Sequence, residues 1–242
     1  MNAPNIPVLA LPTPALPILY GVTTSRASRN VWFLEELGVA YARVLTPYKD
    51  KATHTPEFLA LNPNAHIPVW VDENGVMWES LAINLYLARK HGGAMSPQNR
   101  LPQNRSPQNL SPQTLAEEGQ ALKWSFWAVT ELERDCLTVL MHRLVMPEPN
   151  RKADLAAQAE GALRKPFGVL NAHLSKHAYV LGDRFTVADV NVAAIMAWAR
   201  AAKGLLAEYP ALAAWLASCL QREAYKKLQT YAKAEQTAWN DG

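Results

Sequence analysis

The sequence predicts a chain in two parts, a small α/β unit followed by an all-helical unit. Residues 18–91 alternate short apolar runs with helical patterns, residues 96–115 carry a proline-rich repeat, and strand signals end at Leu115. The chain has 242 residues, 49% hydrophobic and 19% charged, which suffices for a large core and for one or two domains. We therefore expect a flexible arm, an α/β domain, a linker and a helical domain, at residues 1–17, 18–93, 94–114 and 115–242.

The α/β unit begins with a strand, a helix and a second strand. Residues 18–20 form a short apolar run, and residues 30–37 follow as an apolar helical pattern. Gly38 stands directly after this pattern, where glycine commonly ends a helix in the left-handed conformation. Residues 41–45 then have strand character.

The remainder of this unit contains a short helix, a hairpin and a last helix. Thr55 is a suitable N-cap, and Pro56 after it suits the first helical position. Residues 69–71 and 76–78 are apolar runs joined by an Asn-Gly turn, the strongest short-range hairpin signal. Residues 18–91 therefore predict the order β-α-β-α-β-β-α, which suits a domain of the thioredoxin type.

A pentapeptide repeat separates the two units. Prolines recur at positions 97, 102, 107 and 112, and each is followed by Gln and then by Asn or Thr. The repeat has no apolar face that a packed element requires, so we expect an expanded spacer. A docking strip in the polyproline II conformation is the alternative, although Pro-x-x-Pro spacing is absent.

The second unit carries helical periodicity throughout. Leu122, Phe126 and Val129 mark a long amphipathic helix. Thr186 and Asp189 form a capping-box pattern at the start of a later helix, and we assign both a structural role. Further helices are expected around residues 151–176, 186–202, 209–218 and 221–234.

Composition excludes several classes of function. The net charge of +3 is spread along the chain without the basic stripe that nucleic acid requires. The two cysteines, Cys136 and Cys219, have no spacing typical of a metal site or a disulfide framework, so we expect no metal and a reducing compartment. The apolar, proline-rich residues 1–17 lack the features of a signal peptide, and no stretch approaches a membrane span. We expect a cytoplasmic protein.

The segment around Ile67-Pro68, with Glu79-Ser80 further on, predicts a recognition site for a small peptide. Proline cannot donate to a β-ladder and X-Pro bonds adopt the cis form most readily, so a turned-out backbone at Ile67 is expected. Its free N–H and C=O can pair with the main chain of a ligand. Ser80 lies where a helix begins and favours a bound carboxylate, and Glu79 can take an ammonium group.

Taken together, these features resemble the cytosolic glutathione transferases over residues 18–227. The segment from Asn62-Pro63 to Val69 with Glu79-Ser80 is similar to the glutathione-binding signature of that family, whose proline is cis. Residues 182–189, Gly-Asp-Arg-Phe-Thr-Val-Ala-Asp, are similar to its helix-capping element. The resemblance implies glutathione as co-substrate, held by the Ile67 backbone, Pro68, Glu79 and Ser80.

The resemblance also assigns a catalytic hydroxyl to the loop after the first strand. In serine-type members the hydroxyl begins a Ser-x-x-Cys/Ser-x-x-Val stretch, and Ser25 to Val31 match that register. Ser25 would donate a hydrogen bond that favours the glutathione thiolate, because a thiol of pKa about 8.5 is mostly protonated at neutral pH. Thr24 and Ser28 are alternatives, and all three hydroxyls can instead serve only as loop and N-cap groups.

The pocket for the glycine end of glutathione departs from the family pattern. His54-Thr55 stands where related enzymes carry His-Lys, and His66 stands where they carry Gln. The charge of this pocket would therefore depend on histidine protonation. Lys49 or Lys51 can replace the missing lysine.

The site for the second substrate is less determined by the sequence. Tryptophans of the helical half can line a pocket for an apolar electrophile, although at helical spacing they more often form core. Trp124, Trp127 and His142 are the candidates. No cysteine occurs in residues 20–35, which argues against members that reduce mixed disulfides through a covalent route.

The expected function is therefore conjugation of glutathione to small apolar electrophiles, or glutathione-dependent peroxide reduction. The alternative is a non-catalytic protein that keeps the fold for ligand binding or as a scaffold. The resemblance further implies a homodimer acting in detoxification.

Overall fold

The first half of the chain is a four-stranded mixed sheet with helices, as predicted. This computed structural model describes residues 16–49, 51–92 and 109–240. The strands β1 (Ile18–Tyr20), β2 (Ala42–Val44), β3 (Val69–Asp72) and β4 (Gly75–Trp78) lie in the order β2-β1-β3-β4. β2 is parallel to β1, whereas β3 and β4 are antiparallel to their neighbours. The helices of this half are α1 (Ala27–Leu37), α2 (Pro56–Leu61) and α3 (Ser80–His91).

Local signals in the sequence place several of these boundaries. Gly38 ends α1 in the left-handed conformation with φ 64°. The Thr55 side chain accepts a hydrogen bond from the Phe58 N–H at the start of α2, where Pro56 takes the first position. Glu73 and Asn74 turn the chain between β3 and β4, so that Gly75 of the predicted Asn-Gly turn is already the first residue of β4. The predicted order β-α-β-α-β-β-α is thus confirmed.

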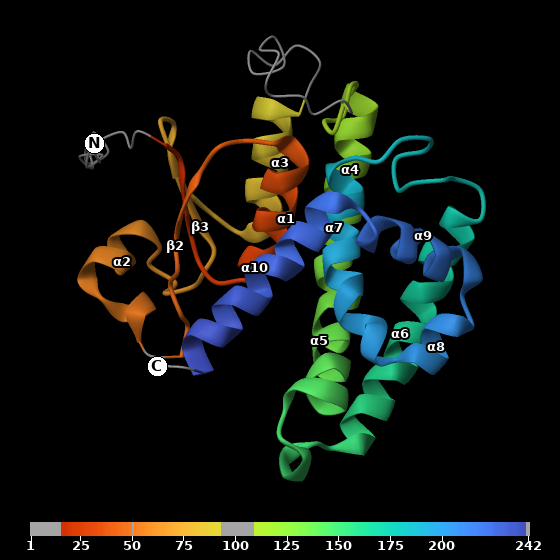
Figure 1. Cartoon of the computed structure of the whole chain (residues 1–242). Coiled ribbons are helices and arrows are strands. Elements are labelled where there is room, and N and C mark those ends of the chain that lie inside the picture. The colour runs from red at the N-terminus through yellow and green to blue at the C-terminus, as the bar shows by residue number, and fades with distance from the viewer. Residues whose placement is uncertain (1–15, 50, 93–108, 241–242) are drawn as a thin grey trace, which may run out of the picture.

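The second half is helical throughout, which confirms the other part of the predicted fold. Figure 1 shows α1 and α3 against α7, so that the two halves meet along these helices, and α1 also packs against α10. One cluster of buried apolar side chains runs through both halves, from Leu19 and Leu34 to Leu132 and Leu216. The helices are α4 (Leu115–Trp127), α5 (Arg134–Leu140), α6 (Ala153–Leu174), α7 (Val187–Met196), α8 (Lys203–Ala207), α9 (Pro210–Leu220) and α10 (Glu223–Asn240).

Short irregular helical segments connect several of these helices. Residues Ala128–Glu133 and Met141–Val145 are π-helical, so that α4 and α5 form one long, interrupted helix. Residues Glu148–Asn150 and Ala197–Ala201 are 3₁₀ segments. π-Helical turns occur frequently at functional sites, because they re-aim side chains within a helix. The first of them ends at Glu133, a residue that contacts the α/β half.

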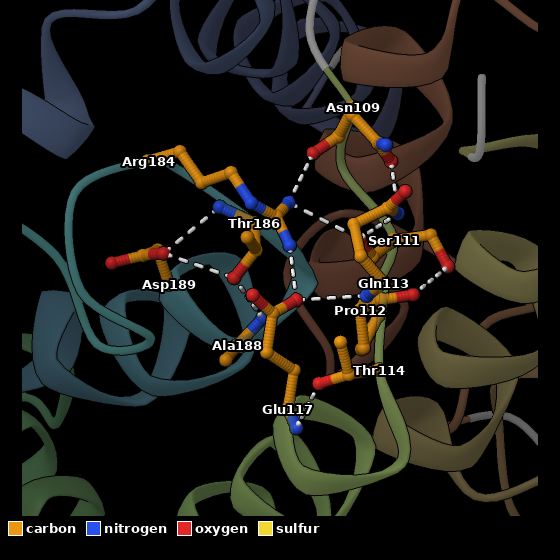
Figure 2. A network of polar contacts seen from close by, with 10 residues as sticks. All are labelled: Asn109, Ser111, Pro112, Gln113, Thr114, Glu117, Arg184, Thr186, Ala188 and Asp189. Atoms are coloured by element: carbon orange, nitrogen blue, oxygen red, sulfur yellow. Dashed lines mark hydrogen bonds and ion pairs between the residues drawn. The ribbon is translucent and has the colours of Figure 1, made fainter.

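The segment before α4 is held against the helical half by Arg184. Figure 2 shows its guanidinium, which donates to the backbone oxygens of Asn109 at 2.6 Å and Ser111 at 3.1 Å and pairs with Glu117. The Leu110 side chain is buried. Residues 109–114 are therefore packed, whereas the rest of the expected 94–114 spacer and most of the expected N-terminal arm lie outside the described residues. The domain limits at residues 18–93 and 115–242 stay a prediction.

Thr186 and Asp189 form the predicted capping box of α7. The Thr186 N–H donates to Asp189 Oδ2 at 2.9 Å, and the Ala188 N–H donates to Thr186 Oγ1 at 3.3 Å (Figure 2). Asp189 also accepts from the Val180 N–H at 2.9 Å and from Trp215 Nε1 at 3.0 Å. The carboxylate therefore connects the start of α7 to α9 and to the preceding loop.

Candidate active site

Three segments that are distant in the sequence converge at one end of the α/β half. A Cβ placed on Gly21 would lie 3.5 Å from the Cβ of Ile67, so the loop after β1 passes close to the Ile67-Pro68 segment. Arg29 Nη1 lies 3.2 Å from Ser80 Oγ, and Asn30 Nδ2 donates to the Ser80 carbonyl at 2.8 Å. These contacts bring together the loop that carries Ser25, the proline segment and the start of α3.

The Ser25 hydroxyl stabilises the loop in this structure. The Ser25 N–H donates to the Val22 carbonyl at 3.1 Å, which closes a turn over residues 22–25. Its Oγ donates to the same carbonyl at 2.7 Å and accepts from the Ala27 N–H at 3.1 Å. Ser25 therefore helps to begin α1, and its single hydroxyl proton points to a backbone oxygen.

The two alternative hydroxyls differ in their surroundings. Thr24 is exposed, and its hydroxyl makes no hydrogen bond to any residue that the structure describes. The Ser28 hydroxyl donates to the Ser25 carbonyl at 2.8 Å, inside the first turn of α1. Thr24 is thus the exposed hydroxyl of the three, whereas Ser25 and Ser28 are both half-buried.

The Ile67-Pro68 segment presents an unpaired backbone. The peptide bond is cis, as the resemblance implies, and Pro68 is buried. Asn62 Nδ2 donates to the His66 carbonyl at 2.8 Å and fixes the approach to the bond. Within the described residues the N–H and C=O of Ile67 form no hydrogen bond. A ligand backbone can therefore pair with them, because buried or half-buried backbone groups require a partner.

The start of α3 combines a strained residue with a buried hydroxyl. Glu79 adopts φ 73° and ψ 106°, a conformation that is costly for a residue with a side chain and that concentrates at functional sites. The Ser80 side chain is buried and accepts from Arg29, so its own proton remains available for a ligand. The first N–H groups of the helix lie beside it and favour an anion.

Arg29 and Glu133 complete this region, although neither was among the predicted site residues. The Arg29 side chain is 2% exposed and lies 3.1 Å from the Glu133 carboxylate, which comes from the end of the π-helical segment. Arg26 pairs with the same carboxylate. Arg29 Nε and Nη2 are buried and find no partner among the described residues.

Burial and neighbouring charges shift the pKa values of both Arg29 and Glu133. Burial lowers the pKa of the Arg29 guanidinium, and the Glu133 carboxylate partly offsets this effect. Burial alone would raise the pKa of Glu133, but the two arginines outweigh it and hold that pKa below the ordinary value of 4.5. The arrangement at neutral pH is therefore a buried ion pair directly behind Ser80.

Trp198 forms an aromatic wall next to the loop. The guanidinium carbon of Arg29 lies 4.9 Å from the centroid of its ring, and that of Arg26 lies 5.9 Å from it. Trp198 comes from the 3₁₀ segment after α7, and its side chain is half-buried. The sequence identifies it only as one of several tryptophans, because nothing local indicates its neighbours.

The predicted aromatic candidates lie elsewhere on the helical half. Trp124 is buried against Trp127 and His173, with ring centroids 5.0 Å and 4.8 Å away. Trp124 precedes Glu133 by nine residues, which corresponds to about 13 Å along a helix. His142 accepts from the Lys152 N–H at 3.3 Å, nine residues beyond Glu133 in the other direction. Among the described residues, no hydrogen bond or ring contact joins Trp124, Trp127 or His142 to the Ser25 loop.

The two histidines predicted for the glycine end are at the surface. His54 is exposed at the end of the 3₁₀ segment Ala52–His54, which precedes α2, and its Nδ1 lies 3.2 Å from Thr53 Oγ1. His66 is exposed, one residue before Ile67. Both imidazoles are thus accessible to a ligand.

The described residues also allow statements about the cysteines, about clusters of possible metal ligands and about membrane-spanning helices. Cys136 and Cys219 are free and buried, and burial raises the pKa of both thiols. Across residues 16–49, 51–92 and 109–240, no three His, Cys, Asp or Glu side chains are grouped to hold a metal ion. No helix in the described part of the chain is long and apolar enough to cross a membrane.

Comparison with known proteins agrees with this geometry. Residues 17–89 match the family model "Glutathione S-transferase, N-terminal domain", and residues 134–223 match "Glutathione S-transferase, C-terminal domain". Glutathione S-transferase 3 of Zea mays is 32% identical over 221 residues, which cover 86% of this chain and 91% of that protein. Glutathione S-transferase GstB of Escherichia coli K12 is 32% identical over 182 residues, covering 72% and 79% of the two chains.

A solved structure extends the similarity to three dimensions. Glutathione S-transferase-I bound with lactoylglutathione superimposes with a TM-score of 0.76 at 25% identity, covering 90% of this chain and all of the other. Both halves, their order and their arrangement are therefore shared. The chain belongs to the glutathione S-transferase family.

Proposed function

We propose that the chain is a glutathione transferase that conjugates the glutathione thiolate to small apolar electrophiles, with glutathione-dependent peroxide reduction as a second reaction of the same thiolate. The observation that carries this proposal is the convergence of the Ser25 loop, the unpaired Ile67 backbone and the start of α3. A peptide that spans these three segments would place its central residue next to the loop hydroxyls.

The charges suit the γ-glutamyl end of glutathione at α3. Its carboxylate would accept from Ser80 and from the free N–H groups of the helix, with the Arg29 guanidinium behind them. Its ammonium group would pair with the exposed Glu79. The cysteinyl main chain would pair with Ile67 beside Pro68, and the glycine carboxylate would extend toward His54, His66 and the nearby lysines.

Ser25 would stabilise the thiolate by turning its proton from the Val22 carbonyl to the sulfur. It can do so while its oxygen still accepts from the Ala27 N–H, so the start of α1 keeps its cap. The N-terminal end of α1 adds a favourable field for an anion. The electrophile would approach past Thr24 and Arg26 along the Trp198 ring.

The second candidate is a non-catalytic protein that binds glutathione-like ligands or acts as a scaffold. The observation that favours it is the 2.7 Å hydrogen bond from Ser25 to Val22, which already uses the only hydroxyl proton of Ser25. In that case Ser25 would be a structural residue, and the remaining site would bind a ligand without activating it.

The test compares the parent chain with Ser25→Ala, using calorimetry with glutathione and turnover of 1-chloro-2,4-dinitrobenzene. We expect glutathione to bind both proteins similarly, and turnover to fall by about a hundredfold or more in Ser25→Ala, the range for losing a single positioned donor. Thr24→Val and Ser28→Ala are matched controls that each remove one neighbouring hydroxyl.

Each outcome identifies a different conclusion. Loss of turnover in Thr24→Val with normal Ser25→Ala turnover would transfer the role to Thr24. Glutathione binding without turnover in the parent would favour the non-catalytic alternative. Absence of glutathione binding at millimolar concentration would contradict the transferase assignment and favour the scaffold alternative.

We further propose that the protein is a homodimer that acts in the cytoplasm in detoxification. The free thiols of Cys136 and Cys219 support a reducing compartment. An apolar face along α4 and the start of the π-helical segment after it supports a dimer, because its side chains are exposed in the single chain. This face consists of Leu115, Leu122, Phe126 and Val129.

A further inference from the structure

The C-terminal helix reaches back to the loop that carries Ser25. Figure 1 shows α10 extending from the helical half across α1 toward β2. Near its end, Glu235 is buried and accepts two hydrogen bonds from Thr23 through Oε2, from the backbone N–H at 2.7 Å and from the hydroxyl at 2.8 Å. These contacts join residues that are 212 positions apart in the sequence.

Thr23 lies in the turn that leads into Ser25. The turn closed by the Ser25 N–H and the Val22 carbonyl has Thr23 and Thr24 as its central residues. Thr23 is buried, so its N–H and hydroxyl need partners, and Glu235 supplies both. The position of the carboxylate therefore fixes the turn two residues before Ser25.

The carboxylate is itself held from the opposite side. Its other oxygen, Oε1, pairs with Arg43 on β2, the strand parallel to β1. The Arg43 guanidinium carbon lies 5.4 Å from the ring centroid of Tyr231, one turn earlier on α10. Both oxygens of Glu235 thus accept from donors of the α/β half, and the side chain cannot shift without breaking one of these contacts.

We propose that Glu235 is a positioning residue for glutathione activation: by holding Thr23, it sets the direction in which Ser25 and Thr24 present their hydroxyls to the sulfur. The inference rests on the proposed function, because it concerns the thiolate formed there. Glu235 does not touch the substrate. Its contribution is geometric, and a small displacement of a group that stabilises charge can cost about a hundredfold in rate.

The decisive variant is Glu235→Gln. An amide has one accepting oxygen, so it can satisfy Thr23 or Arg43 but must present its NH₂ group to the other, which is itself a donor. Thr23→Val is a second, milder variant, because it removes only the hydroxyl contact and keeps the backbone one. Glu223→Gln is the matched control, since it makes the same change at an exposed residue of α10 that pairs with Lys226.

The measurement is the pKa of the glutathione thiol bound to each protein, obtained from thiolate absorbance during a pH titration, with the Kd for glutathione and the melting temperature alongside. We expect Glu235→Gln to raise the thiol pKa by about half a unit or more and to lower kcat about tenfold, with Kd nearly unchanged. Thr23→Val should shift the thiol pKa less, and Glu223→Gln should match the parent.

A purely structural role would give a different result. If Glu235→Gln lowers the melting temperature but leaves the thiol pKa and kcat at the parent values, the inference is wrong. If the parent itself binds glutathione without lowering the thiol pKa, the proposed function fails instead, whatever the variants do. The two failures are therefore distinguishable.

Discussion

Replacing Glu133 by Gln should destabilise the protein strongly, because it leaves a buried cation without its counter-charge. The Arg29 side chain is 2% exposed, and Glu133 is the carboxylate that lies 3.1 Å from it. Desolvation of a guanidinium is costly unless an anion compensates it. The amide of Gln can still accept one hydrogen bond, but it carries no charge.

The size of the effect follows from burial. Breaking a buried ion pair on one side generally costs about 3–5 kcal/mol, and the retained hydrogen bond reduces this to an expected loss of about 2–3 kcal/mol. The half-exposed Arg26 adds little, because exposed pairs contribute about 0–1 kcal/mol. For a chain of this length the loss corresponds to a fall of about 4–12 °C in the melting temperature.

The same pair predicts how this difference depends on pH. The pKa of Glu133 is lowered in the folded protein, below the ordinary value of 4.5. A group with a lowered folded pKa contributes stability above its unfolded pKa and loses it as the pH falls through the folded value. The stability difference between the parent and Glu133→Gln should therefore be full at neutral pH and should shrink below the ordinary value of 4.5.

Urea unfolding at a series of pH values measures this difference. Glu208→Gln is the matched control, because it makes the same substitution in the exposed pair with Arg164 and should leave the unfolding midpoint at the parent value. A Glu133→Gln protein as stable as the parent at neutral pH would refute the reasoning. A stability difference that stayed constant from neutral to acidic pH would refute the ionic part of it.

Two further predictions concern the loop and the dimer. Gly21→Ala should destabilise the chain by about 1–3 kcal/mol and reduce turnover, because Gly21 has φ 140° and an added Cβ would lie 2.7 Å from the Cβ of Ala27. Urea unfolding and the conjugation assay measure the two effects. Gly204→Ala is the control, because its added Cβ meets nothing within 4 Å. Phe126→Glu should convert a dimer to a monomer in light scattering, since the side chain is 67% exposed on the apolar face of α4; a dimer unchanged by this substitution would place the interface elsewhere.

The elements of the fold could be predicted because their signals are local. Thr55 and Pro56 begin α2, Gly38 ends α1 and Thr186 begins α7, each through contacts within a few residues. Such caps depend on neighbouring backbone groups, so the sequence contains both partners side by side. The signal for the Ile67-Pro68 segment is also local, and its peptide bond is cis, as the resemblance implies.

The residues that support the site could not be predicted in this way. Glu133 contacts a partner 104 positions away and Glu235 contacts one 212 positions away. Each carboxylate lies in an amphipathic helix, where an acidic residue ordinarily faces water. The sequence does contain one indication that Arg29 is buried. Trp32 and Phe33, three and four positions later, are apolar, which places Arg29 on a buried face of α1.

The tryptophan next to the Ser25 loop could not be predicted from the sequence either. The sequence offers eight tryptophans, and their spacing alone does not say which ones approach the loop. Trp124 and Trp127 pack together on α4, whereas Trp198 lies over Arg29 because the chain leaves α7 through a 3₁₀ segment at that point. Only the tertiary arrangement distinguishes these cases, since nothing local in the sequence shows which tryptophan lies near Arg29.

The helical half therefore contributes more than the wall proposed for a second substrate. Its carboxylates hold the loop on both sides of Ser25, Glu235 at Thr23 and Glu133 at Arg26 and Arg29. The α/β half supplies the backbone that we propose to pair with a peptide, but on its own it would leave the Thr23 N–H and the Arg29 guanidinium without these acceptors. Because unpaired buried donors are costly, the loop would rearrange, and the hydroxyl at Ser25 would lose its fixed direction. The proposed activating geometry thus depends on the contact between the two halves.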